Sequence, residues 1–262
     1  RLRHRARVAS PSSEPVRRHG RVPFGYGALL LVESTEDRSR PDLETTLHQQ
    51  LKLHYAQDAS QTEVVVGRYR IDAVRNDELI EIQCASLSAI RSKIAALLDR
   101  HSVRVVKPVI RRTRIAKKKT SKGPIVSRRW SPKRGDHLDV FDDLIYFTRV
   151  FPHPNLILEF VTVDVEQVRV PCKRHRRRWR REYQVNDVRL EKIESTLEVQ
   201  TASDLYSIIA MDTQQESFTT EDIAKATGRP RWFAQKIAYV LKHTRAIEPI
   251  GRIRTGIIYR AA

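Results

Sequence analysis

The sequence predicts an α/β protein in which a mixed β-sheet packs against helices and a smaller helical unit follows. Between residues 40 and 110 the apolar spacing gives the order helix, three strands, helix, strand. A short turn joins two of these strands and a helix separates the last two, so antiparallel and parallel pairing are both expected. Residues 200–262 carry helix start and stop signals of their own.

The first helix and the strands after it are each marked by a local pattern. Asp42 is a suitable N-cap, and Leu side chains then recur at every fourth position, as in an amphipathic helix. A β-branched run at 64–66 and an alternating segment at 69–73 are typical of strands. Turn-forming residues at 76–77 indicate a hairpin that returns through 79–82.

The chain then changes pattern several times. Residues 86–101 have helical apolar spacing, and the Val-rich segment 103–110 is typical of a buried strand. We expect residues 111–134 to hold a Lys-rich loop (Lys117, Lys118, Lys119, Lys122) and then a basic run. A helix over 140–150 and a strand over 156–165 should follow.

Helix boundaries are clearest near the C-terminus. Residues 204–211 predict a short helix, and Thr219 and Asp222 have the spacing of a capping box that begins another. Gly228 ends that helix, and Pro230 stands where a new one begins. These signals predict a compact helical unit.

Composition restricts the class of protein. The 262 residues contain 49 Lys and Arg against 31 Asp and Glu, which gives a formal charge of +18. A polyanion is therefore the expected partner, with nucleic acid ahead of a membrane surface. No apolar run approaches the roughly 18 residues that span a bilayer, and the two cysteines exclude a disulfide framework and fit the cytoplasm.

The positive charge is concentrated beside the best-ordered segment. Residues 1–21 hold seven Arg and one acid without periodicity, which predicts a disordered arm that either contacts phosphates or is simply solvated. Residues 111–199 carry a net charge of +10, including runs at 128–134 and 173–181 that each contain one Trp. Both runs are candidate phosphate contacts.

Two acids and an amide form the candidate catalytic constellation. Asp72 lies on one arm of the predicted hairpin, and Glu81 lies on the other with Gln83 two residues on. Residues i and i+2 of a strand share a face, and the hairpin brings Asp72 next to Glu81. Adjacent carboxylates repel unless a cation lies between them, and their hard oxygen atoms suit Mg²⁺.

This pattern resembles the PD-(D/E)XK nuclease superfamily, whose core has the same order of elements. Ile71-Asp72 matches the first part of its motif and Glu81-Ile82-Gln83 the second, with Gln at the usual Lys position. The resemblance implies that Asp72 and Glu81 hold Mg²⁺ (or Mn²⁺), that Gln83 orients the attacking water, and that Glu44 is the extra acid of resolvase-like members. The literal Pro41-Asp42 precedes the first helix and is not the motif.

Each assignment has an alternative. Asp72 and Glu81 also fit the exposed face of a hairpin, paired with cations such as Arg70. Glu44 fits equally well as a first-turn acid favoured by the helix dipole. Lys93 would replace the missing Lys if it faced the site, but its apolar neighbours favour a lysine that extends into solvent.

Two histidines lie on the first predicted helix. His48 and His54 lack metal-ligand spacing with any Cys, and we expect both to be ordinary surface residues.

Residues 200–262 resemble a winged helix-turn-helix. Residues 219–227 would be the supporting helix, 230–243 the recognition helix, and a ribbon around 251–256 the wing. Many winged helices are instead protein-interaction modules, and this alternative stays open.

Together these patterns predict a restriction-endonuclease-like core (αβββαβ) with a C-terminal winged helix. The expected parts are a basic arm at 1–39, a nuclease-like core at 40–110, a basic extension at 111–199 and the winged helix at 200–262. The expected function is metal-dependent endonucleolytic cleavage of DNA, and the alternative is a catalytically inactive nucleic-acid-binding or regulatory protein. RNA fits the Arg tracts equally well, and a homodimer is possible. The expected nucleic-acid contacts are Arg128, Arg129, Lys133, Arg134, Arg176, Arg177, Arg178, Arg231, Lys236, Arg252 and Arg254.

Overall fold

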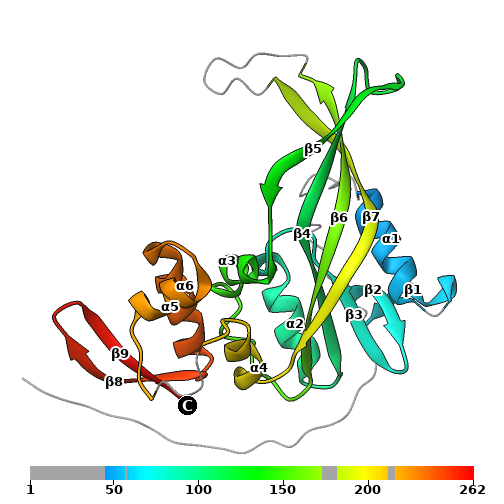
Figure 1. Cartoon of the computed structure of the whole chain (residues 1–262). Coiled ribbons are helices and arrows are strands. Elements are labelled where there is room, and N and C mark those ends of the chain that lie inside the picture. The colour runs from blue at the N-terminus through cyan, green and yellow to red at the C-terminus, as the bar shows by residue number, and fades with distance from the viewer. Residues whose placement is uncertain (1–44, 57, 173–181, 212–215) are drawn as a thin grey trace, which may run out of the picture. The chain divides into compact units, whose positions relative to one another are not determined.

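A mixed seven-stranded β-sheet lies at the centre of the computed structural model (Figure 1). The structure describes residues 45–56, 58–172, 182–211 and 216–262, all within one compact unit, residues 41–262. The strand order is β1-β2-β3-β4-β6-β7, with β5 paired to β4. The strands are β1 (Thr62–Val66), β2 (Tyr69–Arg75), β3 (Glu78–Ile82), β4 (Val103–Lys118), β5 (Ile125–Arg134), β6 (Leu156–Pro171) and β7 (Tyr183–Val199).

Both kinds of strand pairing are present, as the sequence predicts. Strands β1, β2 and β3 pair antiparallel, β3 with β4 and β4 with β6 pair parallel, and β6 pairs antiparallel with β7. The turn between β2 and β3 is Asn76-Asp77, and both residues have positive φ. Asn and Asp tolerate this conformation better than most residues, which explains the tight hairpin.

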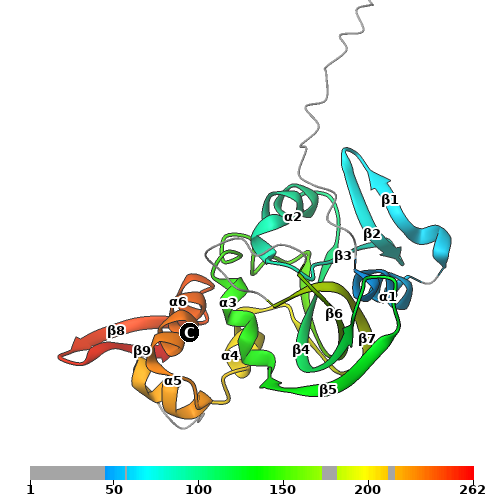
Figure 2. The ribbon, with the colours of Figure 1, turned by 90° about the horizontal axis from the view of Figure 1, so that it is seen from above.

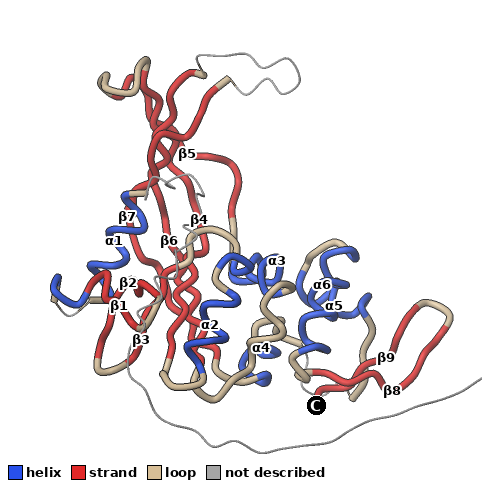
Figure 3. Tube along the Cα trace, turned by 180° about the vertical axis from the view of Figure 1, so that it is seen from behind, coloured by secondary structure: helices blue, strands red, loops and turns tan. Residues whose placement is uncertain are grey.

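Strand β4 has two successive neighbours on one side. It pairs with β3 as far as Val106 and with β5 from Arg112 onward, while β6 follows its other side. Within residues 111–134, part of the expected Lys-rich loop, including Lys119 and Lys122, is the turn between β4 and β5, whereas the strands on either side of it were not predicted. The segment is mostly a hairpin, whose β4 strand buries Ile115 and Ala116 while most residues of β5 stay exposed. Figure 3 shows β4, β6 and β7 continuing beyond the helices.

Helices cover both faces of the sheet (Figure 2). On one face α1 (Thr46–Tyr55) buries Leu47 and Leu51 against β2, β3, β4 and β6. On the other, a 3₁₀ turn (η2, Leu87–Ala89) and α2 (Arg91–Leu98) join a larger cluster. The N-cap of α1 is Thr45, whereas Asp42 lies outside the described residues.

The helix expected over 140–150 is shorter than predicted. The 3₁₀ turn η3 (His137–Val140) leads into α3 (Phe141–Leu144), and turns follow to Val150. Strand β6 extends beyond the predicted 156–165, and β7 was not predicted at all, because its side chains are mostly exposed and show little alternation. A further 3₁₀ turn, η1 (Ala59–Gln61), precedes β1.

The helix start and stop signals at 219–230 are confirmed, whereas the short helix expected over 204–211 lies at Ala202–Ser207. Thr219 and Asp222 form the predicted capping box at α5 (Thr220–Thr227), and Gly228 ends it at φ 63°. Helix α6 (Arg231–His243) follows Pro230, and its apolar side chains belong to the same buried cluster as α2. The remaining elements are α4 (Ala202–Ser207) and the hairpin β8 (Ile247–Ile253) and β9 (Gly256–Ala261). No helix in the described ranges has both the length and the apolarity to cross a membrane.

Candidate active site

Asp72 lies on β2 and is enclosed by donors from two elements. Its Oδ2 accepts the main-chain N–H of Ile82 at 2.8 Å and lies 3.3 Å from His48 Nε2, and its Oδ1 lies 3.1 Å from Lys52 Nζ. His48 and Lys52 both come from α1, four residues apart and so on one face of the helix. The side chain of Asp72 is only 14% exposed, so it is not a surface residue of the hairpin.

Glu81 lies on β3 and is paired with a lysine from the opposite helix layer. Lys93, in the first turn of α2, donates to Glu81 Oε2 at 2.6 Å and also to the carbonyl oxygen of Arg70. Lys93 therefore faces the site, and the expectation that it extends into solvent was wrong. The alternative of cross-strand pairing with Arg70 also fails, because the Arg70 side chain pairs with Glu63.

The two carboxyl groups have pKa values shifted in opposite directions. Burial acts to raise the pKa of Asp72, but the hydrogen bonds from His48 and Ile82 and the charge of Lys52 outweigh it, so the pKa lies below its ordinary value. Burial and then the charge of Asp72 raise the pKa of Glu81, and Lys93 offsets only part of this rise. Opposite shifts in neighbouring acids are typical of catalytic sites, although structural ion pairs produce them too.

Gln83 follows the last residue of β3. Its main-chain N–H donates to Val106 O at 2.9 Å, and its side-chain Oε1 accepts the N–H of Ala85 at 3.1 Å. The amide is half-buried. The main chain of Gln83 therefore continues the pairing with β4 past the end of β3. Its side-chain oxygen stabilises the loop that follows.

The candidate metal ligands are of the type that a hard divalent cation binds, but within the described ranges there are too few of them to form a metal-binding group. His48 Nε2 lies 2.9 Å from the carbonyl oxygen of Ile82 and 3.3 Å from Asp72 Oδ2, so both oxygen atoms contact the same imidazole nitrogen. Carboxylate and carbonyl oxygen atoms are the ligand types that Mg²⁺ prefers. Among the described residues, no three His, Cys, Asp or Glu side chains form a metal-binding group. Glu44, the proposed extra acid, lies outside the described residues.

Three site residues escaped the sequence argument. His48 was expected to be an ordinary surface residue, which is wrong, whereas its neighbour His54 is exposed as predicted. No sequence pattern indicates Lys52, and the apolar neighbours of Lys93 favour solvent, whereas Lys93 contacts Glu81. The available signal was positional: His48 and Lys52 directly follow the buried Leu47 and Leu51 of α1.

The basic residues of β5 differ in what they contact. Arg128 donates to the buried Glu166 at 2.9 Å, and Arg134 donates to the carbonyl oxygens of Ser131 and Lys133. Arg129 and Lys133 are exposed. The ring of Trp130 stacks under the Arg112 guanidinium at 4.1 Å. The predicted contacts Arg176, Arg177 and Arg178 lie outside the described residues.

The basic residues of α6 are separated onto different faces. Lys236 pairs with Asp142 of α3 at 2.7 Å, and Arg229, just before α6, pairs with Asp136 and Asp139. Arg231 instead donates to the carbonyl oxygen of Thr255 in the β8–β9 turn at 2.8 Å. Arg252 and Arg254 are exposed on that hairpin. Lys236 therefore does not share a surface with Arg231.

The part of the chain that holds this site matches the model of a protein family. Residues 45–200 match the family model of a domain of unknown function (DUF8091). The chain belongs to the DUF8091 family. The DUF8091 match runs from the start of α1 to the end of β7, so it contains Asp72, Glu81 and Lys93 and ends before α4.

A relative from a spirochaete is also similar to this DUF8091 protein. An uncharacterized protein of Treponema pallidum (strain Nichols) is 27% identical over 183 residues, which cover 70% of this chain and 72% of the relative. No solved structure matches the chain.

Proposed function

We propose that this DUF8091 protein hydrolyses phosphodiester bonds in DNA with the help of Mg²⁺ or Mn²⁺. The observation that carries the proposal is the position of Lys93, which reaches the buried Glu81 from α2, near the half-buried Asp72. Two acids and a lysine are the side chains that PD-(D/E)XK nucleases use, and Gln83 had left the lysine missing. The restriction-endonuclease-like core and the winged helix are the finer fold assignments that go with this function.

Each residue has a role that follows from its position. The Asp72 and Glu81 carboxylates and the carbonyl oxygen of Ile82 would hold the metal, which lowers the pKa of a bound water when present. The Lys93 ammonium supplies a positive charge beside the acids, where negative charge develops on the phosphate. The Gln83 amide has no charge, so its role is to orient the attacking water.

The exposed basic residues suit DNA phosphates. On β5 these are Arg129 and Lys133, and on the C-terminal hairpin they are Arg252 and Arg254. Arg231 remains on the hairpin side of α6. Lys236 and Arg128 are already paired with acids and contribute less.

One observation favours a second function, a DNA-binding protein without catalysis. Lys52 already neutralises Asp72, which also lies within hydrogen-bonding distance of His48, and Lys93 already neutralises Glu81. Such a set of ion pairs stabilises the fold without a metal and would have to rearrange for one to bind. The charge of the molecule supports DNA binding in either case.

A cleavage assay with near-isosteric variants separates the two functions. Supercoiled plasmid is incubated with wild type, Asp72→Asn and Glu81→Gln in Mg²⁺, Mn²⁺ or EDTA, with Asp99→Asn at an exposed position after α2 as the matched control. We expect wild type and Asp99→Asn to nick the plasmid only with metal, and the two site variants to lose activity while still binding DNA. Equal nicking by all four proteins would refute the site, and binding without nicking by wild type would favour the second function.

A further inference from the structure

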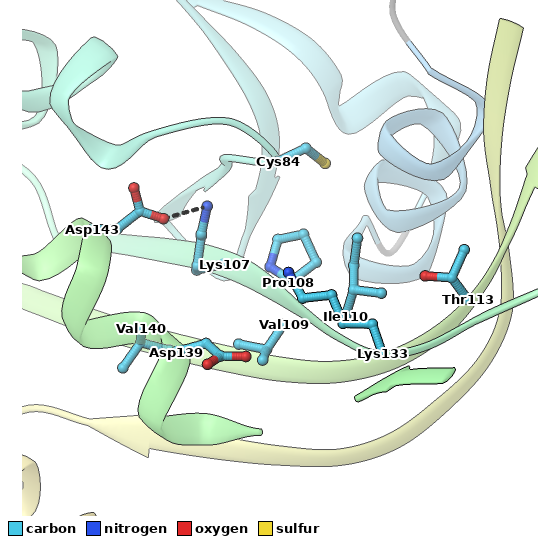
Figure 4. A pocket seen from close by; sticks show the side chains of 10 residues that line it. All are labelled: Cys84, Lys107, Pro108, Val109, Ile110, Thr113, Lys133, Asp139, Val140 and Asp143. Atoms are coloured by element: carbon cyan, nitrogen blue, oxygen red, sulfur yellow. Dashed lines mark ion pairs between the residues drawn. The ribbon is translucent and has the colours of Figure 1, made fainter. Parts of the chain in front are cut away.

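A pocket of about 320 Å³ opens in a gap along the edge of β4 (Figure 4). On this side, β3 pairs with β4 as far as Val106, and β5 pairs with it only from Arg112 onward. Within the described part of the chain, no strand covers the five intervening residues on this side. Pro108, which has no N–H to offer a neighbouring strand, lies in this unpaired stretch, where it is tolerated.

The walls of the pocket come from the parts of the fold that meet at the gap. Pro108, Val109 and Ile110 form the β4 edge, with Thr113 further along the strand and Lys133 from the end of β5. Cys84 follows Gln83 at the end of β3. The last wall is η3 and α3, which contribute Asp139, Val140 and Asp143.

The charges in the pocket are balanced. Lys107 pairs with Asp143 at 2.9 Å, as Figure 4 shows, and Asp139 pairs with Arg229 at 3.0 Å. Lys133 is exposed at the rim. An anion alone therefore gains little here, whereas an uncharged ring with donors and acceptors on its edge finds apolar walls and polar groups of both signs. Volumes near 300 Å³ are at the lower end for small-molecule sites.

The pocket is close to the candidate active site along the chain. Cys84 lies three residues after Glu81, which places the two Cα atoms no more than about 11 Å apart. Lys107 also donates to the carbonyl oxygen of Ala85, so the pocket wall and the loop after β3 are held together. A DNA strand with one phosphate at Asp72 and Glu81 would therefore have a neighbouring base within reach of the gap.

We infer that this gap pocket holds a nucleobase of the bound DNA strand, next to the phosphate at the acids. The inference rests on the proposed function, because it assumes that DNA lies at Asp72 and Glu81. The base has to be unstacked to enter, so the pocket takes single-stranded DNA or a nucleotide turned out of a duplex. Asp143, whose Oδ2 pairs with Lys107, has a second carboxylate oxygen to accept an exocyclic amino group, which carboxylates bind in base recognition.

Photocrosslinking tests the inference without requiring cleavage. Single-stranded DNA containing 6-thioguanine is bound to the full-length protein in EDTA and irradiated, and the crosslinked peptides are identified by mass spectrometry. We expect crosslinks in the peptides that contain Cys84 or residues 107–113. Ile110→Trp, at a pocket residue that is 44% exposed, should reduce them at least fivefold.

The matched control is Leu53→Trp, on the exposed face of α1 and 64% exposed, which should leave the crosslinks unchanged. Crosslinks that map only elsewhere, or that survive Ile110→Trp, would overturn the inference even if the protein cleaves DNA. Pocket crosslinks from a protein that never cleaves DNA would uphold the base pocket and overturn the nuclease proposal. Absence of any crosslink would overturn the pocket, and the plasmid assay would decide the nuclease separately.

Discussion

Lys93 donates to Glu81 at 2.6 Å from the first turn of α2, across the layer boundary between helix and sheet. In the proposed nuclease, a helix would thus supply the lysine of the motif, while Gln83, directly after β3, occupies the usual lysine position. Ile94, directly after it, is fully buried and fixes the rotation of α2. The positive charge beside Glu81 is therefore held in place by helix packing and not by the strand.

This arrangement predicts a rescue. Lys93→Met should lower the rate of metal-dependent cleavage at least 100-fold, since removing one group that stabilises transition-state charge costs about 10² to 10³ in rate. Adding Gln83→Lys to that variant should restore part of the rate, because the ammonium returns at the familiar motif position. Single-turnover cleavage of one plasmid measures both. A double variant no faster than Lys93→Met would show that position 83 does not face the reacting phosphate.

The opposite pKa shifts predict separate titrations of the two acids. Carboxyl ¹³C chemical shifts measured against pH in EDTA should place Asp72 below its ordinary value of 3.8 and Glu81 above 4.5. Lys93→Met should raise the pKa of Glu81 further, because the cation that favours its ionised form is gone. A Glu81 pKa that does not respond to Lys93→Met would contradict the ion pair.

Stability against acid follows from the lowered pKa of Asp72. A carboxyl whose pKa is lower in the folded state stabilises the fold fully above its ordinary value, and loses that effect as pH falls through the folded pKa. The difference in unfolding free energy between wild type and Asp72→Asn should therefore be constant from neutral pH down to about 5 and shrink below 3.8. Urea unfolding at a series of pH values measures it, and a constant difference throughout would refute the shift.

A buried ion network predicts a large loss of stability. Arg104 on β4 contacts Glu78, Glu159 and Glu198, and its side chain is 9% exposed. Arg104→Met leaves buried Glu159 without its cation and should cost about 3 to 5 kcal/mol, as for other broken buried pairs. Arg260→Met, which breaks an exposed pair with Glu248, should cost less than about 1 kcal/mol. Equal losses in urea unfolding would show that the Arg104 network is not buried in solution.

The two faces of α6 predict different effects on DNA binding. Arg231→Glu should weaken binding and reduce the salt dependence by about one unit for each phosphate that is no longer neutralised. Lys236→Gln should leave the salt dependence unchanged, because Lys236 is paired with Asp142. Fluorescence anisotropy over a range of salt concentrations measures both slopes. Unchanged affinity in both variants would indicate that the C-terminal segment binds another protein.

Local signals explain which elements could be predicted. The capping box of Thr219 and Asp222 and the turn at Asn76-Asp77 each depend on interactions within a few residues, and the structure confirms both. Strands β5 and β7 were missed because they lie at edges of the sheet with mostly exposed side chains, so burial leaves no alternating pattern.

The site residues depend on longer-range packing. Asp72 and Glu81 were found because a hairpin places them together, which the sequence shows directly. Lys93 and His48 reach the acids only because their helices are rotated by buried Leu and Ile side chains against the sheet. Likewise, the partner of Lys236 is Asp142, 94 residues earlier, and sequence spacing contains no sign of such a pair.

The parallel pairing of β4 with β6 sets an order of assembly. Val103 pairs with Leu156, so the chain between them must close a long loop before that pairing forms, whereas β2 and β3 meet across a two-residue turn. Loop closure costs entropy, and distant pairings form late. The hairpin with both acids can therefore form while the apolar residues 103–109 still lack their second neighbour. During synthesis this Val-rich strand remains open to pairing with other chains until residue 156 and beyond have emerged, and that interval is when the protein is exposed to aggregation.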